Sequence, residues 1–261
     1  MIIGTAVFAA VFLTGVRLAL RIPVRDYYRV SKKTFVIPDI HGGFVAQGMC
    51  YDEDSSSIFL TGYQNDDQAS PIYVKSKDSD SFKCVRMMMP NGEPSHNHAG
   101  GIAVNDDHVF VAGGFDHCLY VYSKNDILNA ADGANIKCSG TFMAEASDDD
   151  YMQIAFTTIH DGMLYLGEFY REQNYQTLPS HKLTTSGGDY NQALVLAYPL
   201  DDSAEFGVSS KPEAAYSITD LIQGMCIGGD KIYLSASYGI GFKQVYFRQV
   251  HKRKILLRDP S

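Results

Sequence analysis

The sequence predicts an all-β fold, a β-propeller of four-stranded blades, on the strength of three observations. The four residues QGMC stand at positions 47–50 and return at positions 223–226. The chain has 23 glycines, 17 tyrosines and 14 phenylalanines, a composition that favours strands joined by tight turns. A repeat with about four strands in each copy runs through the chain, and such repeats are typical of propeller blades.

Four copies of this repeat align, and each has the same plan. A small or apolar run is followed by a polar turn, and then by an alternating apolar strand that ends in Gly or Ser. The copies begin at Ala46, Ala99, Ile154 and Ile222. A third strand is predicted in each copy, at 71–76, 118–123, 193–200 and 244–250. Outer segments such as SFKCVRMMM and IKCSGTFMAE supply the fourth, and residues 171–192 form an insertion.

Glycine recurs at one place in the repeat, at Gly48, Gly101 and Gly224, whereas the third copy carries Phe156. Glycine weakens a strand but lets another backbone approach closely. The recurrence therefore predicts that the first strand of each blade lies beside a crowded central axis, which explains why the phrase QGMC is used twice. Gln47 and Gln223, one residue earlier, are then expected near the mouth of the central channel.

Four segments together resemble a family of secreted bacterial β-propellers without assigned activity, loosely grouped with propellers like the quinoprotein amine dehydrogenase β-chain. These are FVAQGM, HAGGIAV, LYLGEFY and IQGM…YLSASYG, and the resemblance covers residues 36 to about 240. Relatives of this kind continue past the equivalent of Tyr238 with another inner strand. The resemblance thus implies about five blades, of which the last is missing or incomplete here.

A more distant similarity is to propeller glutaminyl cyclotransferases, which open an inner strand with Phe and then Gln-Gly. Phe44, Gln47 and Gly48 match this pattern, with one extra residue after the Phe. The Glu-Gly expected on further inner strands is absent, because Gly100 and Gly101 stand there. This departure removes the expected catalytic acid.

The chain ends differ in character from the repeats. Residues 1–25 begin with an apolar run and are predicted to be a helix that acts as a signal peptide or a membrane anchor. Residues 29–250 are assigned to the propeller, with an extended strand at 29–40 that completes a terminal blade. Residues 251–261 are basic and are expected to be a disordered tail.

Eight side chains are candidates for binding a ligand at one face of the propeller. His98 and Gln153 occupy matching positions where an inner strand enters the channel, and Glu168 follows a second strand. Glu168 with His181 can form an acid–base pair or a structural salt link, or the two can simply be exposed to solvent. The candidate set is Gln47, His98, Gln153, Glu168, Tyr170, His181, Gln223 and Tyr238.

The formal net charge of −8 argues against a nucleic-acid partner. No zinc-type cysteine spacing, Walker loop, GxSxG or HExxH motif occurs, so neither a metal nor a cofactor is predicted. The predicted function is that of a secreted or membrane-anchored, extracytoplasmic binding or scaffold protein for a small molecule or cell-envelope component. Membrane contact is expected only through the N-terminal segment, and an unclosed ring is expected to self-associate. The alternative is an enzyme, either glutaminyl cyclotransferase-like or a lactonase- or esterase-like hydrolase.

Overall fold

A computed structural model describes residues 2–22, 25–144, 150–229, 231–238 and 244–248 of the chain. The chain forms two compact units, Met1–Ile37 and Pro38–Ser261. The first contains two helices, α1 (Ile2–Arg21) and α2 (Arg25–Val30). Within the described residues, no helix combines the length and the apolar character needed to cross a membrane.

The strand predicted at 29–40 is wrong. Residues 29 and 30 end helix α2, residues 31–37 form neither helix nor strand, and residues 38–43 form turns. The turn at 38–43 has a local cause in Pro38-Asp39: proline has no N–H to give to a ladder, and Asp39 adopts a positive φ of 51°. Asp39 then closes a turn by accepting hydrogen bonds from the N–H groups of Gly42 and Phe44. The predicted basic tail at 251–261 lies outside the described residues.

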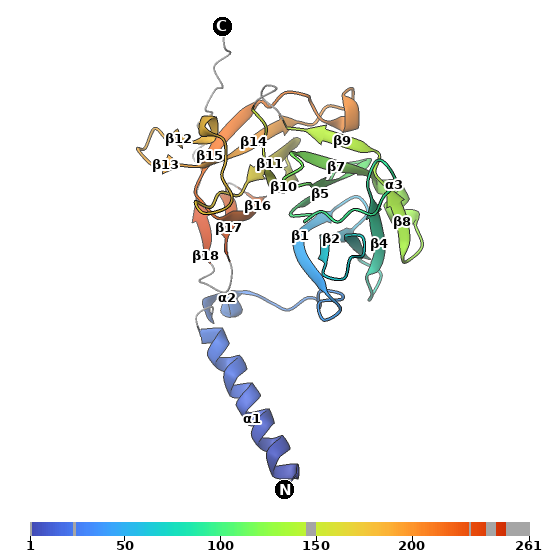
Figure 1. Ribbon diagram of the computed structural model, residues 1–261, viewed down its shortest axis with the longest axis vertical. Helices are drawn as coiled ribbons and strands as arrows, with labels where there is room; N and C mark the ends of the chain where they lie inside the picture. Colours follow the sequence, from blue (N-terminus) through green and yellow to red (C-terminus); the bar gives the residue numbers. More distant parts are fainter. Residues whose placement is uncertain (1, 23–24, 145–149, 230, 239–243, 249–261) are drawn as a thin grey trace. The chain divides into compact units, whose positions relative to one another are not determined.

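The second unit is a β-propeller, and Figure 1 shows its sheets following one another around a common centre. The first sheet is a four-stranded antiparallel meander with one additional strand. Its meander strands are β1 (Phe44–Asp52), β2 (Ser57–Gln64), β3 (Pro71–Ser76) and β4 (Lys83–Met88). The fifth strand, β8 (Ala134–Lys137), pairs parallel to β4, which the repeat pattern did not predict.

The second sheet is also a four-stranded meander, and its outer strand comes from the same segment as β8. Its strands are β5 (Ile102–Val104), β6 (His108–Ala112), β7 (Cys118–Ser123) and β9 (Gly140–Met143), with α3 (Lys124–Asn129) after β7. Lys83 of β4 donates to the carbonyl groups of Ile127, Leu128 and Ala130 at 2.7–3.0 Å. Because these carbonyls end helix α3, the contact fixes the helix against the first blade and brings β8 onto its edge.

The third and fourth sheets continue the same order. The third is β10 (Ile154–His160), β11 (Met163–Glu168), β14 (Ala193–Pro199) and β15 (Ala214–Ile218). The predicted insertion lies between β11 and β14 and contains the 3-10 helix η2 (Pro179–His181) and the ribbon β12 (Leu183–Thr184) with β13 (Tyr190–Asn191). A short 3-10 helix, η3 (Glu205–Gly207), precedes β15. The fourth sheet has three described strands, β16 (Ile222–Gly228), β17 (Lys231–Ala236) and β18 (Gln244–Arg248).

The core is divided among the interfaces between neighbouring blades, because alternate residues of each strand face opposite sides of its sheet. Phe59 and Val85 of the first blade pack with Val109 of the second in one buried cluster. Two further clusters join the second blade to the third, and the third to the fourth. The inner strands accordingly lie side by side in the order β1, β5, β10, β16.

The glycines of the inner strands lie in this crowded centre, as the sequence predicted, but not equally. A Cβ added at Gly48 would lie 2.9 Å from the Cα of Gly101, and one added at Gly101 would lie 2.5 Å from the backbone nitrogen of Thr157. Two inter-blade contacts therefore require glycine. At Gly224 the nearest atom is the hydroxyl oxygen of Ser235, at 3.0 Å, which belongs to the same blade.

Candidate functional site

A β-bulge occurs at the same place on three of the inner strands. In β1, Ala46 pairs with Gly62 and Gly48 with Thr61, so Gln47 is the extra, unpaired residue. The same interruption leaves Gln223 extra in β16 and Ala155 extra in β10. A bulge turns a side chain away from the regular alternation of a strand. In the first blade the sequence Gln47-Gly48 therefore has two local tasks, since Gln47 occupies the bulge and Gly48 makes the close approach to the second blade.

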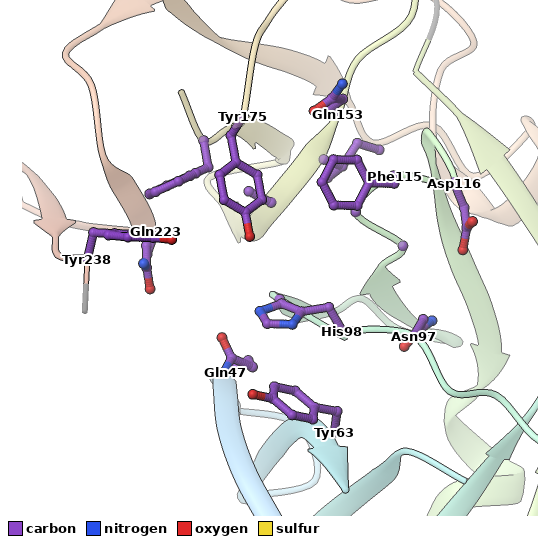
Figure 2. Close-up of a pocket in the computed structure, with 16 residues that line it drawn as sticks. Gln47, Tyr63, Asn97, His98, Phe115, Asp116, Gln153, Tyr175, Gln223 and Tyr238 are labelled. Carbon is purple, nitrogen blue, oxygen red and sulfur yellow. The ribbon is translucent and has the colours of Figure 1, made fainter. Parts of the chain in front are cut away.

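The bulged residues line one cavity at the centre of the propeller. Gln47, Ala155 and Gln223 all face it, together with Gly100, which holds the same place in the second repeat. The cavity has a volume of about 570 Å³ and sixteen lining residues (Figure 2). This volume falls in the range of roughly 300–1,000 Å³ that is common for small-molecule sites.

A second recurring position lines the cavity with aromatic rings. In each of the four blades, an aromatic side chain that faces the cavity lies near the end of the second strand or within three residues after it. These are Tyr63 near the end of β2, Phe115 after β6, Phe169 after β11 and Tyr238 after β17. The segments LTGY, AGGF, LGEF and SASY carried this signal in the sequence.

Five of the eight predicted ligand-binding residues line the cavity: Gln47, His98, Gln153, Gln223 and Tyr238. The other three, Glu168, Tyr170 and His181, do not line it, and all three are buried. Sequence reasoning missed the cavity residues Tyr63, Asn97, Phe115, Asp116, Phe169 and Tyr175. In the third repeat it selected Tyr170 where the neighbouring Phe169 faces the cavity.

Glu168 and His181 form a structural salt link, which the sequence left open as an alternative to an acid–base pair in a ligand site. His181 Nδ1 lies 2.8 Å from Glu168 Oε1, and His181 Nε2 lies 2.9 Å from Asp150 Oδ1. The second oxygen of Glu168 accepts a hydrogen bond from the backbone N–H of Leu194 at 3.1 Å. This chain of contacts fastens the insertion to both strands that flank it, β11 and β14.

Tyr170 is buried for a different reason. Its carbonyl accepts a hydrogen bond from the N–H of Leu221 at 3.1 Å, which joins the third blade to the fourth. The ammonium group of Lys182 lies 5.1 Å from the centre of its ring. Tyr170 is therefore a packing residue behind the cavity wall.

His98 is the titratable base of the cavity. Its ring stacks on that of Tyr63, with centroids 5.0 Å apart and planes at 29°. Partial desolvation at the cavity wall holds the pKa of His98 below its ordinary value, so the imidazole is neutral at pH 7. A neutral imidazole has one donor and one acceptor nitrogen.

Asp116 is the carboxylate among the described lining residues, and it accepts a hydrogen bond from the hydroxyl of Tyr120 at 2.8 Å. Asn97 differs from it, because both amide atoms of Asn97 are shielded from solvent and lack a hydrogen-bond partner in the described part of the chain. Unpaired buried polar groups are costly and call for a partner. Among the described residues, no group of three or more His, Cys, Asp and Glu side chains is arranged to hold a metal ion.

The fold and the cavity define the class of protein: a β-propeller with an amide- and aromatic-lined cavity where its inner strands meet. No protein-family model matches the chain, and no curated protein matches its sequence. Among solved structures it is similar to a glutaminyl cyclase of Myxococcus xanthus, with 11% identity and a TM-score of 0.42, covering 74% of this chain and 62% of the other. The chain thus spans less than two thirds of that enzyme's length.

Two further solved structures are similar. One is a putative 6-phosphogluconolactonase of Bacteroides uniformis, with 12% identity and a TM-score of 0.40, covering 87% of this chain and 72% of the other. The other is the hydrazine synthase of Kuenenia stuttgartiensis, with 9% identity and a TM-score of 0.37, covering 78% of this chain and 58% of the other.

Proposed function

We propose that the protein is an extracytoplasmic binding protein that holds a small, polar ligand in the central cavity of its propeller. The observation that carries this proposal is the convergence of equivalent positions from four repeats, Gln47, Gly100, Ala155 and Gln223, on one cavity. Strands that bring equivalent positions to one point, two of them occupied by glutamine, form a pre-organised site, which lowers the ordering cost of binding. The extracytoplasmic location in this proposal is supported by the apolar helix α1 (Ile2–Arg21), because export signals contain an apolar segment of this kind.

Ligand binding is tested by thermal unfolding of the full chain in the presence of a panel of small polar molecules. A true ligand at 100 times its dissociation constant stabilises the folded state by about 2.7 kcal/mol, and the Gln47→Ala variant should lose this shift. Lys77→Met is a suitable control, because Lys77 is exposed on the turn after β3. Equal shifts in the wild type and in Gln47→Ala would place binding elsewhere and contradict the proposal.

The enzyme alternative depends on His98, the neutral base at the cavity wall. A general base with a pKa below 7 is available in its unprotonated form at neutral pH. An enzyme of this kind would turn over an N-terminal glutaminyl peptide or a lactone, and His98→Ala would abolish that turnover while leaving the fold unchanged. Measured turnover with this dependence would replace the binding role by a catalytic one.

A further inference from the structure

The chemistry of the cavity narrows the class of ligand, and its charge is the first restriction. The described lining has one carboxylate, Asp116, and neither lysine nor arginine. An anionic ligand would leave water without a positive partner in this described lining, which is unfavourable. In Figure 2 the carboxylate of Asp116 points away from the centre, where the polar ends of Gln47, Gln223 and His98 gather. The centre therefore presents uncharged donors and acceptors.

The second restriction is a rigid aromatic wall. Tyr175 stacks on Phe115 with centroids 5.7 Å apart and planes at 17°, and meets Phe169 edge-on at 5.2 Å. Tyr238 lies 6.1 Å from Phe169, and the guanidinium of Arg171 covers its ring at 4.0 Å. These contacts hold the rings in place before any ligand arrives, yet Phe115 remains 61% exposed. An exposed, fixed aromatic surface inside a cavity suits a ligand with a flat apolar face.

The third restriction is the kind of hydrogen bond on offer. The lining has four amide side chains, and each carries an NH₂ donor and a carbonyl acceptor on the same carbon atom: Gln47, Asn97, Gln153 and Gln223. The Nε2 group of Gln223 donates to the carbonyl of Ser237 at 2.6 Å, which orients that amide. Asn97 has both amide atoms unpaired within the described part of the chain, but they are shielded from solvent, so the amides of Gln47 and Gln223 are the ones that a ligand can reach. Two neighbouring hydroxyl groups match one such amide, because each hydroxyl both donates and accepts.

An uncharged ring with a flat C–H face and a rim of neighbouring hydroxyl groups is a pyranose sugar. We propose that the cavity binds an uncharged saccharide, with the sugar face against Phe115 and Tyr175 and its hydroxyl groups on the amides of Gln47 and Gln223. This inference rests on the proposed binding function and specifies its ligand.

Binding to the full chain is measured by calorimetry and by saturation-transfer NMR with three groups of probes. The uncharged sugars are galactose, N-acetylglucosamine and cellobiose; the charged analogues are glucuronate and glucosamine; adenosine is a planar, uncharged ligand of another class. We expect binding of an uncharged sugar and, for the glucuronate probe, an affinity lower by about tenfold or more, since the described lining residues include no lysine or arginine to pair with its carboxylate.

Two variants link binding to the cavity. Phe115→Ala should weaken sugar binding by about tenfold, the value of one aromatic contact, and Gln223→Leu should weaken it as well. Tyr190→Ala removes an aromatic side chain that is similarly exposed, at 60%, on β13 and outside the cavity, and should change nothing. Circular dichroism checks that each variant is folded. Because Phe115 and Gln223 are exposed to solvent, replacing them should leave the fold intact.

The outcomes separate this inference from the proposed function. Binding of adenosine that is lost in Phe115→Ala, without binding of any sugar, overturns the saccharide class and keeps the binding function. Binding of glucosamine or glucuronate, lost in Phe115→Ala and without binding of any uncharged sugar, overturns the uncharged character of the ligand and also keeps the binding function. Failure of every probe, or sugar binding that is untouched by Phe115→Ala and Gln223→Leu, overturns both.

Discussion

The imidazole of His181 lies between two carboxylates, with Nδ1 2.8 Å from Glu168 Oε1 and Nε2 2.9 Å from Asp150 Oδ1. His181 and Glu168 are buried, at 6% and 1% exposure. Only the protonated ring can donate to both partners at once. This arrangement holds the insertion that also contributes Tyr175 to the cavity, so a contact outside the cavity supports its wall.

Replacing His181 by Gln should lower the free energy of unfolding by about 3 kcal/mol, because it leaves Glu168 buried without its charged partner. Urea denaturation measures this change, and an unchanged m-value would show that the folded state is otherwise intact. His96→Ala is the control, since His96 is exposed and should stay within about 0.5 kcal/mol of the wild type. A loss no larger than that of the control would mean that the salt link does not contribute to the free energy of unfolding.

The same site predicts a pH dependence. Burial by itself lowers the pKa of His181, but the hydrogen bond and charge of Glu168, together with Asp150, raise it above its ordinary value. A raised folded pKa means that the contribution to stability is complete below the unfolded pKa of about 6.5 and is lost as the pH rises through the folded pKa.

The stability difference between wild type and His181→Gln should therefore shrink as the pH rises from 6 through the raised pKa of His181. Desolvation lowers the pKa values of His98 and His108, so their contributions to stability change with pH in the opposite direction to that of His181. Both contributions are the same in the wild type and in the variant, and taking the difference removes them. Chemical denaturation at several pH values measures it. A difference that grows with pH would contradict the charged state assigned to His181.

Equivalent glycines of the repeat should respond differently to alanine. Gly101→Ala forces a Cβ to within 2.5 Å of the Thr157 backbone nitrogen, and the backbone of the next blade cannot move aside. Overpacking of this kind costs about 3 kcal/mol. At Gly224 the Cβ meets only the Ser235 hydroxyl, which can rotate, so Gly224→Ala should cost less than about 1 kcal/mol. Thermal or urea unfolding of the two variants compares them directly, and equal costs would refute the asymmetry.

Lys124 and Asp52 form a buried ion pair between the first and second blades, with Nζ 2.9 Å from Oδ2 and both side chains 7% exposed. Burial acts to raise the pKa of Asp52, but hydrogen bonds from Ser55 and Lys124 outweigh it and lower the pKa. Lys124→Met should destabilise the protein by about 3 kcal/mol at pH 7.

The loss in Lys124→Met should diminish as the pH falls through the lowered pKa of Asp52, because protonation removes the charge that the lysine balances. Acid titration of stability for the wild type and the variant measures this. Lys77→Met, on an exposed lysine, controls for the loss of a positive charge. A loss that is constant down to low pH would show that packing of the lysine stem, and not the ion pair, carries the effect.

Much of the blade structure could be predicted because it depends on neighbouring residues. The third strands at 71–76 and 118–123 coincide with β3 and β7, since period-two alternation of apolar side chains is a local pattern. The segment IKCSGTFMAE was taken as one outer strand, yet its first half joins the first blade as β8 and its second half joins the second blade as β9. The end of helix α3, just before β8, is held on the first blade by Lys83, which is more than forty residues away from it in the chain, so no local pattern shows the division.

By itself the sequence determined the repeat, the inner-strand glycines and the glutamines that precede them, because strand alternation and close backbone approach need particular residue types at particular spacings. Only the tertiary structure decided that Phe169 and not Tyr170 faces the cavity, that Tyr175 joins it from an insertion, and that His181 binds Glu168 and Asp150 behind it. These contacts join residues that no local pattern relates, since they form only when separate blades and loops pack around one centre.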